Sequence, residues 1–363
     1  SAHCVEYAKL VREKSVLRNL INTGSKIVEN AYSLEEVEKI LDQAERSILK
    51  IGERTIDRSF RPIKAIIDKA FENLVDIKVK HDSRQDNKYV SGVSTGYDAL
   101  DTLTTGFHHT DLVIVAARPS MGKSALALNF AYNMAQRTDQ MVGIFSLEMS
   151  AEQIALRLLS MASRVPFSKL RKGDITNDEW DQLTNAASRL TDMNLIIDDD
   201  SMLEPRTLRT KARRIKKEYG LDIVVVDYLQ LMNCGKEREN RQQEISEISR
   251  SMKLLGKELD VVVIAASQLS RSIEQREDKR PRLSDLRESG AIEQDADTVL
   301  FIHREAYYKR KKDGSDENEV QIMNEPHEAE IIIGKQRNGP IGTVRLTFDP
   351  NYVSFYPVDY ARY

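Results

Sequence analysis

The sequence predicts an α/β fold in which a mostly parallel, twisted sheet is flanked by helices and preceded by an α-helical hairpin and a linker helix. From about Val90 onward, short β-branched runs alternate with helical stretches, which is typical of parallel strands joined by covering helices. Before Val90 the apolar residues recur at helical spacing instead. We therefore expect a helical front (residues 1–53), a linker (residues 54–90) and one α/β domain (residues 91–363).

Composition fits a protein with a substantial core and gives no global sign of a nucleic-acid partner. The 363 residues are 40% hydrophobic and carry a formal charge of -3, so any nucleic-acid site must be a local basic patch. Cys4 and Cys234 are far apart and have no further ligand at metal-binding spacing, which argues against a zinc site or a disulfide framework and favours a reducing, cytoplasmic setting. The longest apolar runs are far shorter than the roughly 20 residues of a membrane span.

The helical front is predicted to form an antiparallel hairpin. A turn signal lies near residues 22–33, and residues 33–36 read Ser-Leu-Glu-Glu, the pattern of a capping box. The following apolar seam must pack against another helix, either the first helix of the same hairpin, which we favour, or the same hairpin in another subunit. Its members are Leu34, Val37, Leu41, Ala44 and Ile48.

The linker is predicted to contain one amphipathic helix over about residues 62–78. Pro62 suits a first helical turn, and an apolar stripe runs from Ile63 to Leu74. Residues 78–89 are almost entirely polar, which predicts a flexible tether. The helix is therefore free to pack on its own domain or on a neighbouring subunit.

The first strand of the α/β domain, residues 112–117, leads into a phosphate-binding loop. Residues 117–124 match the G-x-x-x-x-G-K-[ST] pattern except that Ala117 stands at the first glycine, and a helical stretch follows. Such a loop offers N–H groups to phosphates, while Lys123 adds a cation and the Ser124 hydroxyl ligates Mg²⁺. We expect ATP to contact Ser120, Met121, Gly122, Lys123, Ser124 and Ala125.

Three further strands end in residues that suit ATP hydrolysis. Glu148 follows residues 141–146 and is placed to deprotonate an attacking water, although a solvated loop residue or a helix cap is an equal alternative. Asp227 follows an apolar strand in the Walker B arrangement and would bind nucleotide-associated Mg²⁺ together with Ser124. Gln268 ends the strand after it and can sense a γ-phosphate. Since ligands of open α/β sheets bind at the carboxyl ends of strands, these residues should line one crevice.

Two basic regions are candidates for contacts with other molecules. Lys335 and Arg337 lie two residues apart on a strand with no acid between them, so they should project from one face and repel each other unless an outside anion is present. That anion would be a nucleotide phosphate on the next subunit, and the alternative is an exposed basic hairpin. The arginine-rich loop 269–293 is placed to contact a DNA backbone without reading sequence. Residues 206–217 are predicted to be a basic helix with a solvated surface face, DNA or partner contact being the alternative, and residues 309–319 an exposed loop.

Six motifs, in this order, make the sequence resemble the DnaB-type replicative helicases of bacteria and phages. They are ARPSMGKS, FSLEMS, VVVDYLQL, ASQLSR, DLRESGAIEQDAD and KQRNGPIG. The resemblance covers essentially the whole chain, and Ala117 is usual in that family. It implies a RecA-like P-loop NTPase core, a homohexameric ring with ATP sites between subunits, and 5′ to 3′ movement on single-stranded DNA that unwinds forked duplex DNA. Implied site residues are Lys335 and Arg337, acting in trans, and Arg271, Arg287, Glu288 and Gly290 in DNA-contacting loops.

The resemblance departs at the front, because family members carry a globular helical domain before the hairpin. Residues 1–53 therefore look like the remnant of a longer N-terminal domain, and docking of a primase or a helicase loader is in doubt. The resemblance also favours docking of the linker helix on the adjacent ATPase domain. Two other functions remain open: a RecA-like recombinase, which would form a filament and pair homologues, and a non-enzymatic scaffold, which would show negligible DNA-stimulated ATP turnover.

Overall fold

The computed structural model describes residues 2–32, 39–41, 43–48, 63–82, 90–137, 140–233, 241–308 and 325–358. The chain divides into two compact units, Ser1–Val79 and Lys80–Tyr363. Among the described residues, no helix is long and apolar enough to cross a membrane.

The first unit is helical, as its apolar spacing predicts, but many of its apolar side chains are exposed. Helix α1 (Ala2–Ala31) continues through the expected turn signal at Gly24, and the Asn30 side chain then donates a hydrogen bond to Gln43 in the next helical stretch, at 3.1 Å. Leu41 and Ile48 remain 64% and 52% exposed, so the favoured packing of the seam inside the hairpin is wrong for these two residues. Leu34 and Val37 lie outside the described residues.

The linker helix α3 (Ile63–Asp82) begins just after Pro62 and extends beyond the predicted end near residue 78. The polar residues at its end contain neither glycine nor proline, so nothing in the sequence stops the helix there. Its apolar side chains, including Ile63, Ile67 and Phe71, are exposed. This helix therefore carries an apolar stripe that is exposed to solvent.

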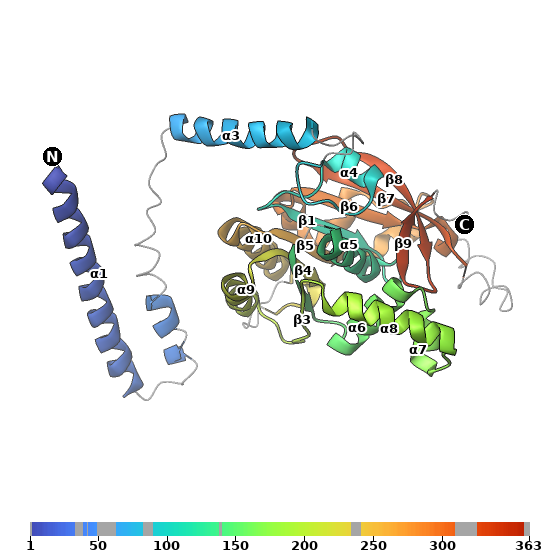
Figure 1. Cartoon of the computed structure of the whole chain (residues 1–363), viewed down its shortest axis with the longest axis horizontal. Coiled ribbons are helices and arrows are strands. Elements are labelled where there is room, and N and C mark those ends of the chain that lie inside the picture. The colour runs from blue at the N-terminus through green and yellow to red at the C-terminus, as the bar shows by residue number, and fades with distance from the viewer. Residues whose placement is uncertain are drawn as a thin grey trace. The chain divides into compact units, whose positions relative to one another are not determined.

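The second unit is built on one twisted sheet (Figure 1). Its strand order is β3-β2-β4-β5-β1-β6-β7-β8-β9, in which β3 through β6 run parallel and β7, β8 and β9 are antiparallel additions at one side. The strands are β1 (Leu112–Ala117), β2 (Met141–Ser146), β3 (Leu195–Asp198), β4 (Leu221–Asp227), β5 (Val262–Gln268), β6 (Thr298–His303), β7 (His327–Gln336), β8 (Gly342–Asp349) and β9 (Ser354–Pro357).

Helices cover both faces of this sheet and create two apolar cores. One core joins α5 and α6 to side chains of one sheet face, and the other joins α9 and α10 to side chains of the opposite face (Figure 1). The helices of this unit are α4 (Asp98–Thr104), α5 (Lys123–Arg137), α6 (Ala151–Ser163), α7 (Phe167–Lys172), α8 (Asn177–Thr191), α9 (Pro205–Tyr219), α10 (Arg241–Leu259) and α11 (Gly290–Asp295), with 3-10 turns η1 (Leu229–Leu231), η2 (Arg271–Gln275) and η3 (Leu283–Ser289).

The basic stretch at residues 206–217 lies on α9, as predicted, and its cations are paired with acids. Arg209 and Arg213 both contact Glu258 of α10, and Lys211 contacts Asp198 at the end of β3 and Asp200 just after it. These ion pairs reduce the positive charge that the helix presents to solvent. The expected exposed loop at 309–319 lies outside the described residues.

Candidate active site

The carboxyl ends of four neighbouring parallel strands meet at one cavity of about 400 Å³. The phosphate loop after β1 forms one side, and Glu148, Tyr228 and Gln268 follow β2, β4 and β5. Parallel pairing places these strand ends in register, with Ala117 opposite Gln268 and Ser146 opposite Asp227. The sheet thus brings residues from distant parts of the chain to one edge, as expected of an open α/β fold.

The phosphate loop has a backbone that suits its pattern of residues. Ser120 and Gly122 adopt left-handed φ angles of 65° and 96°. The φ angle favours glycine at position 122, and a Cβ there would also make a tight contact of 3.1 Å with the Phe355 ring. Ala117, by contrast, is the buried last residue of β1. A side chain at that position therefore fits without strain.

Lys123, which lines the cavity, forms an ion pair with the buried Asp227. The Lys123 Nζ lies 3.3 Å from Asp227 Oδ1 and 3.5 Å from the centre of the Tyr228 ring. Burial lowers the pKa of Lys123, while the charges of Asp227 and Glu148 act in the opposite direction. Carboxylate charge and an aromatic ring therefore stabilise the Lys123 ammonium group when no phosphate is bound.

The Asp227 carboxylate fits a metal-binding role. Its Oδ2 atom is buried, and within the described part of the chain it accepts no hydrogen bond. A buried carboxylate oxygen without a partner is costly unless a cation or a donor completes it. Ser124, at the first turn of α5, lines the same cavity and offers a hydroxyl oxygen. The two residues are suitable oxygen ligands for Mg²⁺.

Glu148 is an exposed carboxylate at the rim of the cavity, and an arginine that the sequence did not single out lines it too. Arg157 extends from α6, and burial lowers its pKa while the charges of Asp227 and Glu148 oppose that shift. This places a cation and a potential general base together beside the phosphate loop. Only the packing of α6 against the sheet reveals Arg157, because it belongs to no recognisable motif.

Gln268 is fixed by a second glutamine that sequence reasoning also missed. The Gln230 side chain donates to the Gln268 carbonyl and accepts from the Gln268 amide, both at 3.1 Å, and donates to Ser267 Oγ at 2.9 Å. Gln230, Gln268 and Arg271 line a second pocket of about 350 Å³ that shares Gln268 with the nucleotide-sized cavity. The end of β5 therefore borders both pockets.

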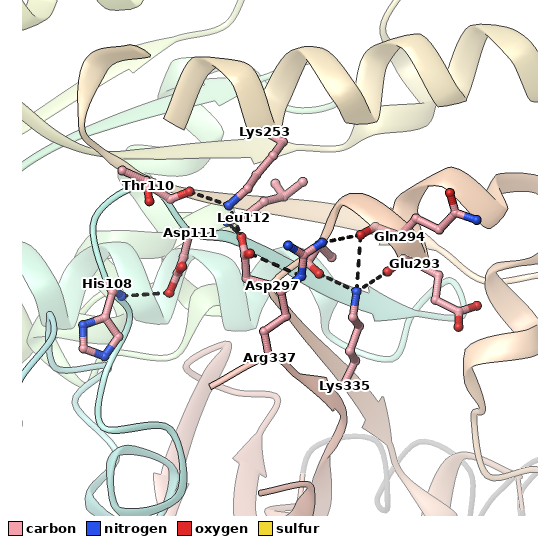
Figure 2. Close-up of polar contacts among 11 residues, drawn as sticks. His108, Thr110, Asp111, Leu112, Lys253, Glu293, Gln294, Asp297, Lys335 and Arg337 are labelled. Atoms are coloured by element: carbon pink, nitrogen blue, oxygen red, sulfur yellow. Dashed lines mark hydrogen bonds and ion pairs between the residues drawn. The ribbon is translucent and has the colours of Figure 1, made fainter. Parts of the chain in front are cut away.

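Lys335 and Arg337 do not line this cavity but meet around the C-terminal end of α11 (Figure 2). Lys335 Nζ donates to the carbonyls of Glu293 and Ala296 at 2.5 and 2.7 Å. Arg337 donates to the Gln294 carbonyl at 2.6 Å and lies 3.6 Å from the Asp297 carboxylate. Arg337 therefore does not depend on an outside anion alone for charge compensation, because the fold supplies Asp297 from a distant part of the sequence.

The arginine-rich loop divides into paired and exposed cations. Arg276, Arg280 and Arg282 contact Asp285, Glu330 and Asp278, respectively. Arg271 is exposed and borders the second pocket.

The other expected DNA-contacting residues follow on η3 and at the start of α11. The side chains of Arg287 and Glu288 lie outside the described part. Gly290 has an ordinary helical φ of -51°, and a Cβ there would meet nothing within 4 Å. The fold itself therefore does not require glycine at this position.

Comparison with known proteins gives a consistent family assignment. The family model described as the DnaB-like helicase C terminal domain matches residues 92–357. The replicative DNA helicase DnaB of Geobacillus stearothermophilus is 47% identical over 357 residues, which cover 98% of this chain and 75% of that protein. The replicative DNA helicase DnaC of Bacillus subtilis (strain 168) is 46% identical with the same coverage.

Solved structures are similar over the same region. A structure described as an ATPase domain has a TM-score of 0.72 and 37% identity, covering 83% of this chain and all of that one. A DnaB-like replicative helicase, solved in a study of its interactions with primase, has a TM-score of 0.76 and 35% identity, covering 98% of this chain and 78% of that one. The RecA-like α/β fold expected from the sequence is thereby confirmed.

Proposed function

Because this chain belongs to the family of DnaB-like helicases and is a replicative, ATP-hydrolysing DNA helicase, we propose that it works as a hexameric ring with ATP bound between adjacent subunits. In this ring, each subunit contributes its phosphate loop to one site and its Lys335 and Arg337 to the next. The ring moves 5′ to 3′ on single-stranded DNA and separates the strands of a forked duplex.

The observation that carries this proposal is the meeting of Lys123, Glu148, Asp227 and Gln268 at one edge of the sheet. Nucleotide hydrolysis needs a cation at the phosphates, a carboxylate for the metal ion, a general base and a group that senses the γ-phosphate. Lys123, Asp227, Glu148 and Gln268 suit these four tasks, in that order. The absence of Lys335 and Arg337 from the lining of this cavity supports their assignment to another subunit's site.

Each residue has a distinct task in hydrolysis. The phosphate-loop amides and Lys123 bind the β- and γ-phosphates, and Glu148 accepts the proton of the attacking water. Arg157 holds a positive charge beside Glu148 and neutralises charge that develops on the γ-phosphate. When bound by Ser124 and Asp227, Mg²⁺ would neutralise phosphate charge and orient the nucleotide.

Gln268 and the arginine-rich loop couple the state of the bound nucleotide to the binding of DNA. Gln268 lines both the nucleotide cavity and the second pocket, and Arg271 lines the second pocket. A movement of Gln268 on loss of the γ-phosphate is thus transmitted to a loop whose cations contact the DNA backbone together with Arg287, Glu288 and Gly290. Phosphate contacts of this kind are independent of sequence.

A primase is the protein partner that the comparisons favour. One similar helicase was studied for its interactions with primase, and we propose the same association for this chain. A helicase loader is a second expected partner, since a closed ring must be placed on DNA that has no free end.

Subunit mixing tests whether the ATP site is shared. Arg337→Ala and Glu148→Gln subunits should each be nearly inactive alone, with Arg337→Ala lowering hydrolysis on the order of a thousandfold. In a mixed ring, an Arg337→Ala subunit supplies Glu148 while its Glu148→Gln neighbour supplies Arg337, so some sites are complete. ATPase activity should return on mixing. If co-assembled mixtures remain inactive, Arg337 does not act in trans.

A further inference from the structure

Asp297 occupies the centre of a polar cluster that joins four elements of the fold (Figure 2). It lies just before β6 and is 6% exposed. Its Oδ2 atom accepts a hydrogen bond from the Leu112 amide at 2.8 Å and contacts Lys253 Nζ from α10. Its backbone amide donates to the Leu112 carbonyl, and its carbonyl accepts a hydrogen bond from the Arg337 amide, both at 2.9 Å. The carboxylate is therefore held in one place from several sides.

The other oxygen of Asp297 faces Arg337. Arg337 Nε lies 3.6 Å from Asp297 Oδ1, and the Arg337 side chain is still 47% exposed. One edge of the guanidinium is thus oriented by a fixed charge, while much of the group stays open to the surroundings. A side chain held in this way loses less conformational entropy when it later binds an anion.

Asp297 can attract Arg337 even though Lys253 already contacts the Asp297 carboxylate. Lys253 also donates to the Thr110 carbonyl at 2.8 Å, so its charge is shared between two acceptors. The Nζ of Lys335 is directed to carbonyls of the α11 end, and burial together with the charge of Arg337 lowers the pKa of Lys335. Among the described residues, Asp297 is the acid that forms an ion pair with Arg337.

We propose that Asp297 is a positioning residue for Arg337: its buried carboxylate, anchored by Lys253 and the Leu112 amide, fixes the place from which Arg337 reaches the nucleotide on the neighbouring subunit. This inference rests on the trans-acting role proposed above for Arg337. Asp297 contacts neither nucleotide nor water in this scheme. Its effect on hydrolysis passes entirely through the arginine.

Asp297→Asn removes the charge and keeps the size of the side chain, and Asn can still accept the hydrogen bond of the Leu112 amide. Because misplacement of a reacting group by about 1 Å costs on the order of a hundredfold in rate, ATPase activity should fall about a hundredfold. ATP affinity, measured by titration with a nonhydrolysable analogue, should stay at the wild-type value. Asp111→Asn is the matched control, because Asp111 lies beside the same cluster but contacts the His108 amide rather than Arg337, and it should keep wild-type activity.

Subunit mixing separates positioning from general damage. Asp297→Asn subunits mixed with Glu148→Gln subunits should regain ATPase activity, because a Glu148→Gln subunit supplies an intact Asp297 and Arg337 to its neighbour's site. Mixed with Arg337→Ala subunits, Asp297→Asn should stay inactive, since every interface then has a faulty arginine. The opposite result, rescue by Arg337→Ala but not by Glu148→Gln, would overturn the assignment.

A second variant covers the event that Asp297→Asn destabilises the domain by leaving Lys253 buried without its anion. The double variant Asp297→Asn with Lys253→Met removes both charges, and its thermal unfolding midpoint should return toward that of the wild type. Its ATPase activity should remain low and should still be rescued by Glu148→Gln subunits. If activity returns together with stability, Asp297 serves only the fold and the proposal is wrong.

The outcomes also distinguish this inference from the proposed function. If Arg337→Ala and Glu148→Gln do not complement each other, the shared site itself fails. If they complement while Asp297→Asn and Glu148→Gln do not, only the positioning role of Asp297 fails.

Discussion

At the scale of single residues, the cavity assigns different tasks to Lys123 and Glu148. The Lys123 side chain is only 12% exposed and contacts Asp227, whereas Glu148 is exposed. A buried cation suits binding of phosphate, and a solvated carboxylate suits acceptance of a proton from water. Substitution of the two residues should therefore affect different steps.

Glu148→Gln should retain ATP binding but lower hydrolysis by about two to four orders of magnitude, because an amide can hydrogen-bond a water yet cannot accept its proton. Lys123→Ala should instead weaken nucleotide binding itself. Titration with ATP in the presence of Mg²⁺, followed by steady-state ATPase assays, checks both. Normal turnover by Glu148→Gln, or normal ATP affinity of Lys123→Ala, would remove that residue from its role.

Residues in motifs were predictable from the sequence, while those that support them were not. Lys123 and Asp227 follow strands in recognisable patterns, and in the structure Lys123 lines the cavity and forms an ion pair with the buried Asp227. Arg157, Gln230 and Asp297 belong to no such pattern. Asp297 is one acid among several in its segment, and only its burial between β1, α10 and β7 distinguishes it.

At the scale of elements, two strands have the bounds that the sequence predicts. The sequence predicts residues 112–117 and 141–146, and β1 and β2 have these bounds. The strands β3, β6 and β9 were not identified. β3 and β9 have only four residues each, and a short apolar run such as β6 cannot be told from a buried helical turn by periodicity. The phosphate loop was found because its strand and helix are both regular.

The start of α11 offers a test of the DNA-contacting loop. Gly290 has a helical backbone and open space at its Cβ position, so Gly290→Ala should leave stability unchanged or raise it by about 0.4–1 kcal/mol. If DNA approaches the backbone closely here, the same substitution should weaken single-stranded DNA binding. Fluorescence anisotropy with a single-stranded oligonucleotide, beside thermal unfolding, measures both. Unchanged DNA affinity would exclude a close contact at this glycine.

At the scale of the whole molecule, we propose that apolar side chains on α3 take part in assembly with other subunits. Ile67 and Phe71 lie one helical turn apart and are exposed, and the family resemblance implies docking on the adjacent ATPase domain. The sequence predicted this apolar stripe but left its partner open. No pattern within one chain specifies which surface of another copy will cover it.

The double substitution Ile67→Asp with Phe71→Asp should prevent ring assembly while leaving the ATPase unit folded, because charges on the stripe oppose its burial. Analytical ultracentrifugation should show smaller species, and circular dichroism should show a preserved thermal transition. Lys64→Asp is the matched control, since it places an acid on the same helix at an exposed polar position and should leave assembly intact. A ring that persists in the double variant would show that α3 does not link subunits.

Unwinding of a forked duplex is the decisive assay, because it distinguishes a helicase from a recombinase and from a nucleotide-dependent scaffold. The substrate is a labelled fork with single-stranded 5′ and 3′ tails, and forks that lack one of the two tails serve for comparison. The reaction contains ATP and Mg²⁺, and the Glu148→Gln variant is the inactive control. We predict strand separation that requires ATP hydrolysis and a 5′ tail on the strand that the ring encircles. Hydrolysis of ATP without strand separation would contradict helicase activity, and strand separation that depends only on the 3′ tail would contradict 5′ to 3′ movement.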